Sequence, residues 1–313
     1  MKSYPAKLLL FGEHTVNTGS QALAVPLPLF SGKWQFATST GKAELAGRQM
    51  KLPQFVDWLE HLSKRKELLC EVDTAAFWDA LRRGLIFESN IPTGYGAGSS
   101  GALVAAVFGE WTKEGSDWAS GTRHQKPQAI LKLKNTLAQL EGFFHGTSSG
   151  TDPLICFLQQ PVLLGGHAGV RIPDLPDRPL PEHPVFFLLD TGQGRDATPL
   201  IAYFLEKMKE PAFYDRCKQE LVPVVDSAIS AFLSGDRLRL FEDMHRIGEF
   251  QLLFFEKLIP EAFRPLWKEG LEGELFKLKT CGAGGGGFLL GITNDFAALQ
   301  LRYPNLRMLS VVR

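Results

Sequence analysis

A glycine-rich stretch between an extended run and a small-residue segment carries the clearest chemical signal in this sequence. Residues Ile91–Gly101 read I-P-T-G-Y-G-A-G-S-S-G. Glycines at this spacing let the backbone turn its N–H groups inward. The helix predicted over Ala102–Phe108 adds the unpaired N–H groups and partial positive charge of its N-terminus. Such a loop suits an anion, most naturally phosphate. Ser99 and Ser100 then lie where a hydroxyl can reach a phosphate oxygen or its Mg2+.

The same glycines admit other interpretations. Gly96, Gly98 and Gly101 also satisfy G-x-G-x-x-G, the dinucleotide-binding fingerprint, which is a weak signal by itself. A nicotinamide site needs a second strand ending in an acidic residue, and Glu110–Ser120 has no strand-like run. The Walker A pattern fails because no Lys-Ser or Lys-Thr follows the glycines. A glycine-rich turn before a packed helix, without any chemistry, stays open as an alternative.

A second glycine-dense run, Gly282–Gly287, lies between Leu278 and Phe288. Ordering it costs conformational entropy, which close approach of the backbone to a ligand or to another loop would offset. A flexible hairpin tip is the alternative. Two glycine loops in different domains indicate a nucleotide held between them.

Two carboxylates flank the segment E-G-F-F-H-G-T-S-S-G-T-D. Glu141 is expected on or beside the apolar stripe of its helix, where an ionised carboxylate needs a partner such as a divalent cation. Asp152 follows a small-residue loop, Gly146–Gly150, that can bring a substrate close. Taken singly, Glu141 is more often a structural ion pair, and Asp152 a cap or turn residue. His145 alone is more often a hydrogen-bonding residue than a catalyst.

The N-terminal segment P-A-K-L-L-L-F-G-E-H places Lys7 at the head of an apolar strand. A positive charge at the head of an apolar strand indicates that an anion lies nearby. Glu13 and His14 follow at a turn, and a solvated loop is the alternative for them.

Composition narrows the class of protein. With 34 basic and 34 acidic residues the formal net charge is zero, which implies no basic surface for nucleic acid. The apolar run Leu8–Phe11 is too short for a signal peptide or a membrane span. The four scattered cysteines contain no C-x-x-C pair, which argues against a disulfide framework or a zinc site and favours reduced thiols. We expect a soluble cytoplasmic protein.

The elements that must position these residues mix strands and helices, so the expected class is α+β. Two domains, 1–175 and 176–313, are divided in the proline-rich stretch Arg171–Pro184. Extended segments are predicted over Lys7–Phe11, Gln21–Phe30, Lys33–Ala37, Pro153–Leu164 and Val185–Leu189, with a strand–loop–strand near the C-terminus. Helices are predicted over Phe55–Leu69, Asp73–Arg83, Pro127–Phe144, Leu200–Met208, Pro223–Leu233 and Leu238–Leu258. The stretch Glu110–Lys126 is predicted as a surface excursion.

In combination and in this order, the four motifs resemble those of the GHMP kinases, most closely their mevalonate kinase branch. Gly12–His14 is similar to that branch's G-E-H, and Pro92–Gly101 resembles P-x-G-x-G-L-G-S-S-A. His145–Asp152 matches H-G-x-P-S-G-x-D, and Lys279–Gly287 matches K-x-T-G-A-G-G-G-G. The resemblance runs from about residue 5 to residue 291.

Four positions depart from the family's pattern. Ala97 stands where Leu is usual, Gly101 where Ala is usual, Ser148 where Pro is usual, and Cys281 where Thr or Ser is usual. None removes a charged catalytic group, but they bear on the choice of substrate and, for Cys281, on contacts near the phosphates.

The resemblance implies a fold and an activity. The fold has an N-terminal domain like ribosomal protein S5 domain 2 and a ferredoxin-like C-terminal domain, with the active site in the cleft between them. The activity is transfer of the γ-phosphate of Mg-ATP to a small-molecule alcohol, with mevalonate first among the acceptors. The alternatives are phosphomevalonate, homoserine or a sugar as acceptor, or an inactive nucleotide-binding homologue. A homodimer is one candidate assembly.

The resemblance also implies roles for single residues. Asp152 would orient the acceptor hydroxyl and take its proton, with Lys7 beside it to keep it ionised and to stabilise the developing alkoxide. Ser100 and Glu141 would hold Mg2+. The ATP phosphates would be held by residues of the two glycine loops, namely Pro92, Gly94, Gly96, Ala97, Gly98, Ser99, Ser100, Gly282, Ala283, Gly284 and Gly285. The acceptor would be faced by four residues, Glu13, His14, Arg195 and Thr198, with Arg195 meeting a substrate carboxylate.

Overall fold

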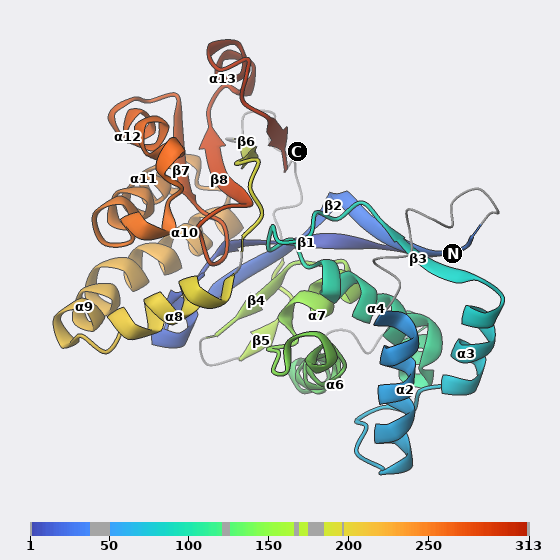
Figure 1. The fold of residues 1–313 in the computed structure, drawn as a ribbon. Coiled ribbons are helices and arrows are strands. Elements are labelled where there is room, and N and C mark those ends of the chain that lie inside the picture. The colour runs from blue at the N-terminus through green and yellow to red at the C-terminus, as the bar shows by residue number, and fades with distance from the viewer. Residues whose placement is uncertain are drawn as a thin grey trace. The chain divides into compact units, whose positions relative to one another are not determined.

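The structure is a computed structural model that describes residues 2–37, 51–120, 126–165, 169–174, 185–195 and 197–311. The chain divides into two compact units (Figure 1). The first unit consists of Met1–Lys7, Pro26–Pro92 and Ala97–Gln160, and the second of Leu8–Val25, Thr93–Gly96 and Pro161–Arg313. Strands β1 (Ser3–Phe11) and β2 (Ala22–Phe36) each pass from one unit to the other.

Strand pairing connects the start of β2 to the strands that follow Pro161. Strand β4 (Val162–Leu164) pairs with Ala22–Ala24 at the start of β2 and with the short strand β5 (Val170–Arg171). The C-terminal segment of the second unit begins at Pro161, just before β4. The predicted boundary between residues 175 and 176 lies outside the described residues and stays a prediction.

In the first unit, strand β3 (Leu85–Ser89) pairs antiparallel with β2 from Gly32↔Ser89 to Phe36↔Leu85. The extended segments predicted over Gln21–Phe30 and Lys33–Ala37 thus belong to one long strand. Its two prolines lie between the stretches that pair with β4 and with β3, where a missing N–H removes no bond to either partner. The helices of this unit are α2 (Lys51–Lys64), α3 (Thr74–Arg82), α4 (Ser99–Trp111), α5 (Lys113–Ser120), α6 (Pro127–His145) and α7 (Thr151–Leu158).

The central helix of the first unit is α4, which packs against α6 and α7. Its small apolar residues are buried from Ala102 onward, and Trp34 of β2 donates its indole N–H to the Ala106 carbonyl at 3.2 Å. Sequence signals at helix starts are confirmed. Asp73 caps α3 by accepting from the Ala76 N–H at 2.9 Å, and α6 begins with Pro127.

One sequence prediction in this unit is wrong, and another needs detail. Pro153–Leu164 was expected to be extended, but α7 occupies 151–158 before β4 begins. Pro153 lies in the first turn, where a helix needs no N–H, and the apolar run behind it is buried on every side and so lacks helical periodicity. The predicted surface excursion contains α5, because Thr112 Oγ1 accepts from the Gly115 N–H at 2.9 Å and caps a new helix.

In the second unit, four strands form an antiparallel sheet in the order β7-β8-β6-β9. They are β6 (Val185–Asp190), β7 (Phe276–Thr280), β8 (Phe288–Thr293) and β9 (Met308–Ser310). Helices separate β6 from β7 and β8 from β9, so the chain follows the ferredoxin-like β-α-β-β-α-β path that was expected. The core of this layer contains Phe187, Leu189, Ile259, Trp267, Phe276, Leu278, Leu289, Leu299 and Met308.

The helices of the second unit are α8 (Ala197–Lys207), α9 (Pro211–Arg216), α10 (Val222–Ser234), α11 (Arg237–Phe254), α12 (Arg264–Glu272) and α13 (Phe296–Arg302). A π-helical turn, Cys217–Leu221, joins α9 to α10, and two 3-10 turns, Glu256–Leu258 and Glu261–Phe263, precede α12. Both α11 and α12 pack against β7 (Figure 1). Trp267 of α12 donates to the Gly248 carbonyl of α11 at 3.0 Å, which joins the two helices.

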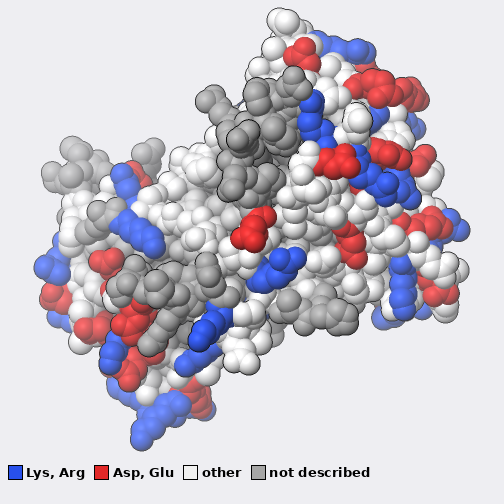
Figure 2. Space-filling view, turned by 180° about the vertical axis from the view of Figure 1, so that it is seen from behind, with Lys and Arg blue, Asp and Glu red and all other residues white. Residues whose placement is uncertain are grey.

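Charged side chains of both signs are interspersed over the face seen in Figure 2. Several pair with near neighbours in the sequence, including Lys64 with Glu60 in α2 at 2.9 Å and Lys209, just after α8, with Glu206 at 2.6 Å. Across the described ranges, none of the helices has the length and apolarity needed to cross a membrane.

Candidate active site

The first glycine loop leads directly into a helix N-terminus, as predicted. Gly98 is the N-cap of α4, with φ of 79°, and Gly94 and Gly96 have φ of 79° and 69°. These left-handed values strain any residue that carries a Cβ, which explains the glycine spacing. Ser99 and Ser100 open the helix, so the unpaired N–H groups of the first turn follow immediately after the loop.

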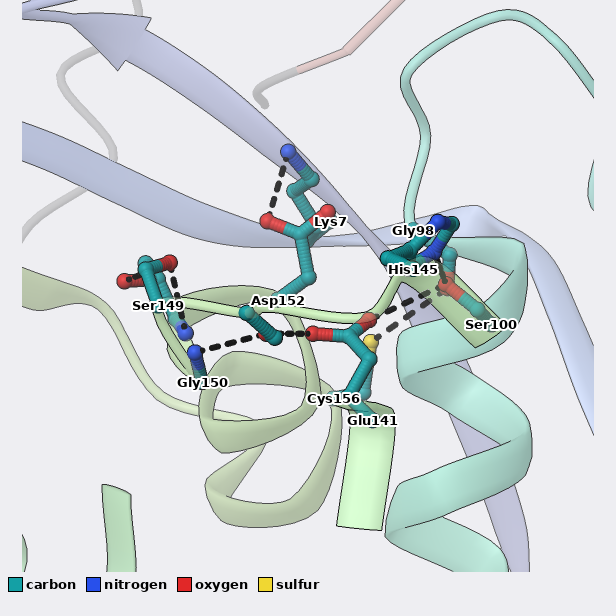
Figure 3. A network of polar contacts seen from close by, with 11 residues as sticks. Lys7, Gly98, Ser100, Glu141, His145, Ser149, Gly150, Asp152 and Cys156 are labelled. Carbon is teal, nitrogen blue, oxygen red and sulfur yellow. Dashed lines mark hydrogen bonds and ion pairs between the residues drawn. The ribbon is translucent and has the colours of Figure 1, made fainter. Parts of the chain in front are cut away.

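Lys7 and Asp152 form an ion pair beside this helix N-terminus (Figure 3). Lys7 Nζ lies 2.8 Å from Asp152 Oδ1, with 11% of the lysine side chain exposed and 32% of the aspartate. The Lys7 backbone N–H donates to the Ala97 carbonyl at 3.0 Å, which fixes β1 to the loop. A Cβ on Gly98 would lie 2.8 Å from Lys7 Cγ, so glycine is also required here by close approach.

Glu141, near the end of α6, has a buried carboxylate that two hydroxyls bind. Ser100 Oγ donates to Oε1 at 3.0 Å and Ser148 Oγ donates to Oε2 at 2.5 Å. Burial raises the pKa of the Glu141 carboxyl and the Asp152 charge raises it further, whereas the two hydrogen bonds lower it. The sequence expectation that this carboxylate lies on the apolar stripe and needs partners is confirmed.

His145 lies at the end of the same helix and contacts Ser100. Its Nε2 is 3.0 Å from Ser100 Oγ. Because the Ser100 hydroxyl proton points to Glu141, the imidazole must carry its proton on Nε2 and donate it to Oγ. This is the hydrogen-bonding role that the sequence favoured for His145.

The donor set at Ser100 and Glu141 fits Mg2+. A carboxylate and a hydroxyl are hard oxygen ligands, and Mg2+ commonly takes only one or two protein ligands, completing its shell with phosphates and water. In the part of the chain that the structure describes, no group of three or more His, Cys, Asp or Glu could hold a metal.

Gly101 and Cys156 are buried near Asp152, and sequence reasoning did not predict this packing. A Cβ on Gly101 would lie 2.9 Å from Asp152 Cβ and from the Asp152 carbonyl carbon, so α4 and α7 meet at a distance that only glycine permits. Cys156 is fully buried, with Sγ 4.0 Å from the Gly98 carbonyl. The one signal for Gly101 was its departure from the usual alanine.

In the second unit, Glu13 is buried and forms an ion pair with Lys279 of β7. Lys279 Nζ also donates to the Thr280 carbonyl at 2.8 Å. Burial raises the pKa of the Glu13 carboxyl, and the Lys279 charge opposes that shift. The solvated-loop alternative for Glu13 is therefore wrong. Lys279 opens the second glycine motif, but nothing in the sequence indicated its partner.

His14 packs its ring against aromatic side chains. Its centroid is 4.7 Å from that of Phe204 and 5.7 Å from that of Phe255. Both ring nitrogens are buried, and neither has a hydrogen-bond partner among the described residues. Burial and the positive charges of Lys279 and Arg195 lower the pKa of His14 to about 4, so the ring is neutral at pH 7.

Arg195 joins the two glycine loops within the second unit. Its backbone N–H donates to the Gly94 carbonyl at 3.0 Å, and Nη1 donates to the Gly286 carbonyl at 2.7 Å. A Cβ on Gly96 or on Gly282 would clash with Nη2, so both loops approach the guanidinium closely. Thr198 lies three residues on, in the first turn of α8.

The second glycine run is packed against neighbouring backbone. Five of its glycines have φ between 68° and 150°. Gly285 N–H donates to the Leu258 carbonyl at 2.6 Å and Gly287 N–H to the Gln193 carbonyl at 2.7 Å. A Cβ on Gly287 would lie 2.9 Å from Tyr95 Cα in the first loop. Close approach to other loops, which the sequence favoured over a flexible hairpin tip, is confirmed.

Comparison with known proteins identifies sequence relatives. No protein-family model matches the chain. It is 25% identical to the mevalonate kinase of Thermococcus gammatolerans over 189 residues, which is 53% of this chain and 56% of that protein, so that match spans little more than half its length. It is 24% identical to the mevalonate kinase of Pyrococcus abyssi over 312 residues, or 93% of this chain and 88% of that protein.

Solved structures share the fold across nearly the whole chain. L. major mevalonate kinase in complex with R-mevalonate superposes with a TM-score of 0.63 at 17% identity, covering 99% of this chain and 95% of that one. Streptococcus pneumoniae phosphomevalonate kinase in complex with phosphomevalonate and AMPPNP gives 0.63 at 15%, covering 99% of each chain. Lactococcus lactis galactokinase complexed with galactose gives 0.64 at 13%, covering 99% and 92%.

The fold is that of the GHMP kinases, with the α+β architecture expected from the sequence. Within that class, the sequence relatives are mevalonate kinases, of which this chain is a distant homologue.

Proposed function

We propose that this chain is a kinase that transfers the γ-phosphate of Mg-ATP to the hydroxyl of a small-molecule alcohol, and that mevalonate is the acceptor. The observation that carries the proposal is the ion pair of Lys7 and Asp152 beside the N-terminus of α4. Mevalonate is favoured because the sequence relatives are mevalonate kinases. Fold neighbours that bind phosphomevalonate and galactose show that the fold alone does not choose the acceptor.

Phosphoryl transfer asks a protein mainly for positioning and for neutralisation of charge. The N–H groups of the first glycine loop and of the first turn of α4 would bind the ATP phosphates, together with residues of Gly282–Gly285. Ser100 and Glu141 would hold Mg2+, which when bound neutralises charge on the phosphates. The left-handed glycines of the first loop suit this role because such a backbone can turn successive N–H groups toward an anion.

Asp152 would accept the proton of the acceptor hydroxyl as its oxygen bonds to phosphorus. A general base must lie within hydrogen-bonding reach of the proton it takes. Lys7, held at 2.8 Å from Asp152, would orient that carboxylate and stabilise the negative charge that develops on the acceptor oxygen.

Four residues of the second unit are proposed to recognise the acceptor: Glu13, His14, Arg195 and Thr198. The two unpartnered ring nitrogens of His14 suit a ligand hydroxyl or carboxylate, since buried polar atoms are normally hydrogen-bonded. Arg195 keeps donors beyond the Nη1–Gly286 bond for a carboxylate. Because Lys279 engages Glu13, the part proposed for Glu13 is to hold that lysine's charge in place.

The dinucleotide alternative lacks structural support. The fingerprint requires a second strand after the helix, and residues 113–120 form helix α5. An oxidoreductase is therefore not proposed.

The test is release of ADP from Mg-ATP with mevalonate, phosphomevalonate, homoserine or galactose as acceptor. Mevalonate should give the highest kcat/KM, and Asp152→Asn should reduce it by about 100-fold or more. Equal rates in the two proteins would remove Asp152 from the mechanism. ATP binding without consumption across the panel would instead indicate an inactive nucleotide-binding homologue.

A further inference from the structure

The loop between α6 and α7 departs from the motif it resembles at Ser148, where proline is usual. A proline side chain has no hydrogen-bonding group, whereas this hydroxyl acts both as donor and as acceptor. Ser148 Oγ donates to Glu141 Oε2 at 2.5 Å and accepts from the Gly150 backbone N–H at 2.9 Å. The departure therefore adds two contacts that the usual residue cannot make.

These contacts connect two helices through one hydroxyl. Glu141 lies in the last turns of α6, and Gly150 is the N-cap of α7, with φ of 70°. Asp152 follows in the first turn of α7. The other oxygen of Glu141 accepts from Ser100 of α4, so the carboxylate is bound both from α4 (Figure 3) and from the loop that leads into α7.

We propose that Ser148 is a positioning residue that orients the Glu141 carboxylate for Mg2+ and fixes it relative to Asp152. The proposal rests on the proposed kinase function. A carboxylate that binds a metal through one oxygen is held in place by a hydrogen bond to the other. Loss of such a partner typically weakens metal binding by 10-fold to 100-fold. Ser148 is the candidate partner because Ser100, the other donor, is itself proposed to bind the metal.

The same loop offers a matched control. Ser149 contributes a hydroxyl from the next position, and its contacts are local, with Thr151 Oγ1 at 3.1 Å and the Thr151 N–H at 3.3 Å. Ser149→Ala therefore removes a hydroxyl from this loop without removing a bond to Glu141.

The experiment measures ADP affinity by calorimetry, once with saturating Mg2+ and once in EDTA. Mg2+ should raise the ADP affinity of Ser148→Ala by a factor about 10-fold smaller than in the parent protein. The ADP affinity of the variant in EDTA should equal that of the parent. Ser148→Thr, which keeps the hydroxyl, should recover most of that gain, and Ser149→Ala should retain all of it. In steady-state assays Ser148→Ala should need more Mg2+ for half-maximal rate, with the KM for the acceptor unchanged.

A parent-like Mg2+-dependent gain in Ser148→Ala would overturn the proposal and leave the kinase function standing. If that variant does not fold, Ser148→Pro decides, because proline is the usual residue of the motif and lacks the hydroxyl. The same loss in Ser148→Pro supports the proposal, and an unchanged gain overturns it. A parent protein whose ADP affinity does not respond to Mg2+ at all would overturn both the proposal and the proposed function.

Discussion

At the scale of single residues, Lys7 and Asp152 are the pair on which the proposed chemistry depends. We expect Lys7→Met to lower kcat by about 100-fold with little change in nucleotide affinity, because the lost charge would act on the developing alkoxide. Lys33→Met is the control, since Lys33 is an exposed β2 lysine paired with Glu88 at 3.8 Å. Steady-state kinetics and calorimetry on both variants check this. A fall in kcat common to both would contradict the role given to Lys7.

His14 should make stability depend on pH. Its pKa is about 4 in the folded chain and ordinarily about 6.5, so the unfolded chain binds the proton more readily. The resulting stability is fully present above pH 6.5 and is lost as the pH falls toward 4. Between these limits the parent should lose up to about 3 kcal/mol more unfolding free energy than His14→Asn. Asparagine does not titrate in this range and, like histidine, is enriched among residues with positive φ, which is 70° here.

Urea titrations at several pH values between 4 and 7 measure that difference. Parallel curves for the parent and His14→Asn would show that the ring is not buried in its neutral form, and would also weaken the role proposed for it in acceptor recognition.

At the scale of elements, the crossing of α4 and α7 is set by Gly101. Alanine favours a helix interior by about 1 kcal/mol over glycine. Here its Cβ would press on Asp152, and overpacking costs roughly 1–3 kcal/mol. We therefore expect Gly101→Ala to leave stability unchanged or lower it by up to about 2 kcal/mol, and to lower kcat by displacing Asp152.

Gly142 in α6 is the matched control, because a Cβ there meets nothing within 4 Å. Gly142→Ala should raise stability by roughly 0.5–1 kcal/mol. Thermal unfolding and kcat of the two variants decide the matter. If both substitutions stabilised the protein equally and left kcat unchanged, α4 and α7 could accommodate the added Cβ without moving Asp152. That result would contradict the role given to Gly101.

The ion pair of Glu13 and Lys279 joins the turn after β1 to strand β7. Lys279→Met leaves a buried carboxylate without its partner and should destabilise the protein by about 3–5 kcal/mol. The double variant Glu13→Gln with Lys279→Met should recover much of that loss, since no charge is then stranded. Denaturation of the two single variants and the double variant forms the test cycle, in which purely additive losses would contradict the pairing.

Much of the element pattern could be predicted from the sequence because caps and periodicity are local signals. Asp73 and Pro127 mark helix starts by their own chemistry, and the glycines of both loops mark positions where a Cβ is not tolerated. Helix α7 is not predicted because its residues Pro153–Phe157 are all buried, so its hydrophobic residues show no helical period. The segments Gln21–Phe30 and Lys33–Ala37 are predicted separately, whereas β2 runs through both without a break at Ser31 and Gly32.

At the scale of the whole molecule, each compact unit is assembled from segments far apart in the sequence. Order along the chain could therefore locate the motifs but not their contacts. Asp152 and Lys7 were both candidates from residue type and spacing, whereas the partners Ser148–Glu141 and Glu13–Lys279 depend on pairing across the fold. The similarity to mevalonate kinases also spans the whole molecule, since one such relative matches 94% of the chain at 24% identity.

The most direct test of the central claim is to identify the phosphorylated product. Phosphorus NMR can do so in a reaction that contains the protein, Mg-ATP and mevalonate. The account predicts a new phosphate monoester on the mevalonate hydroxyl that appears together with ADP, requires Mg2+ and nearly vanishes with Asp152→Asn. ADP accompanied only by inorganic phosphate, or the monoester formed equally fast by Asp152→Asn, would contradict it.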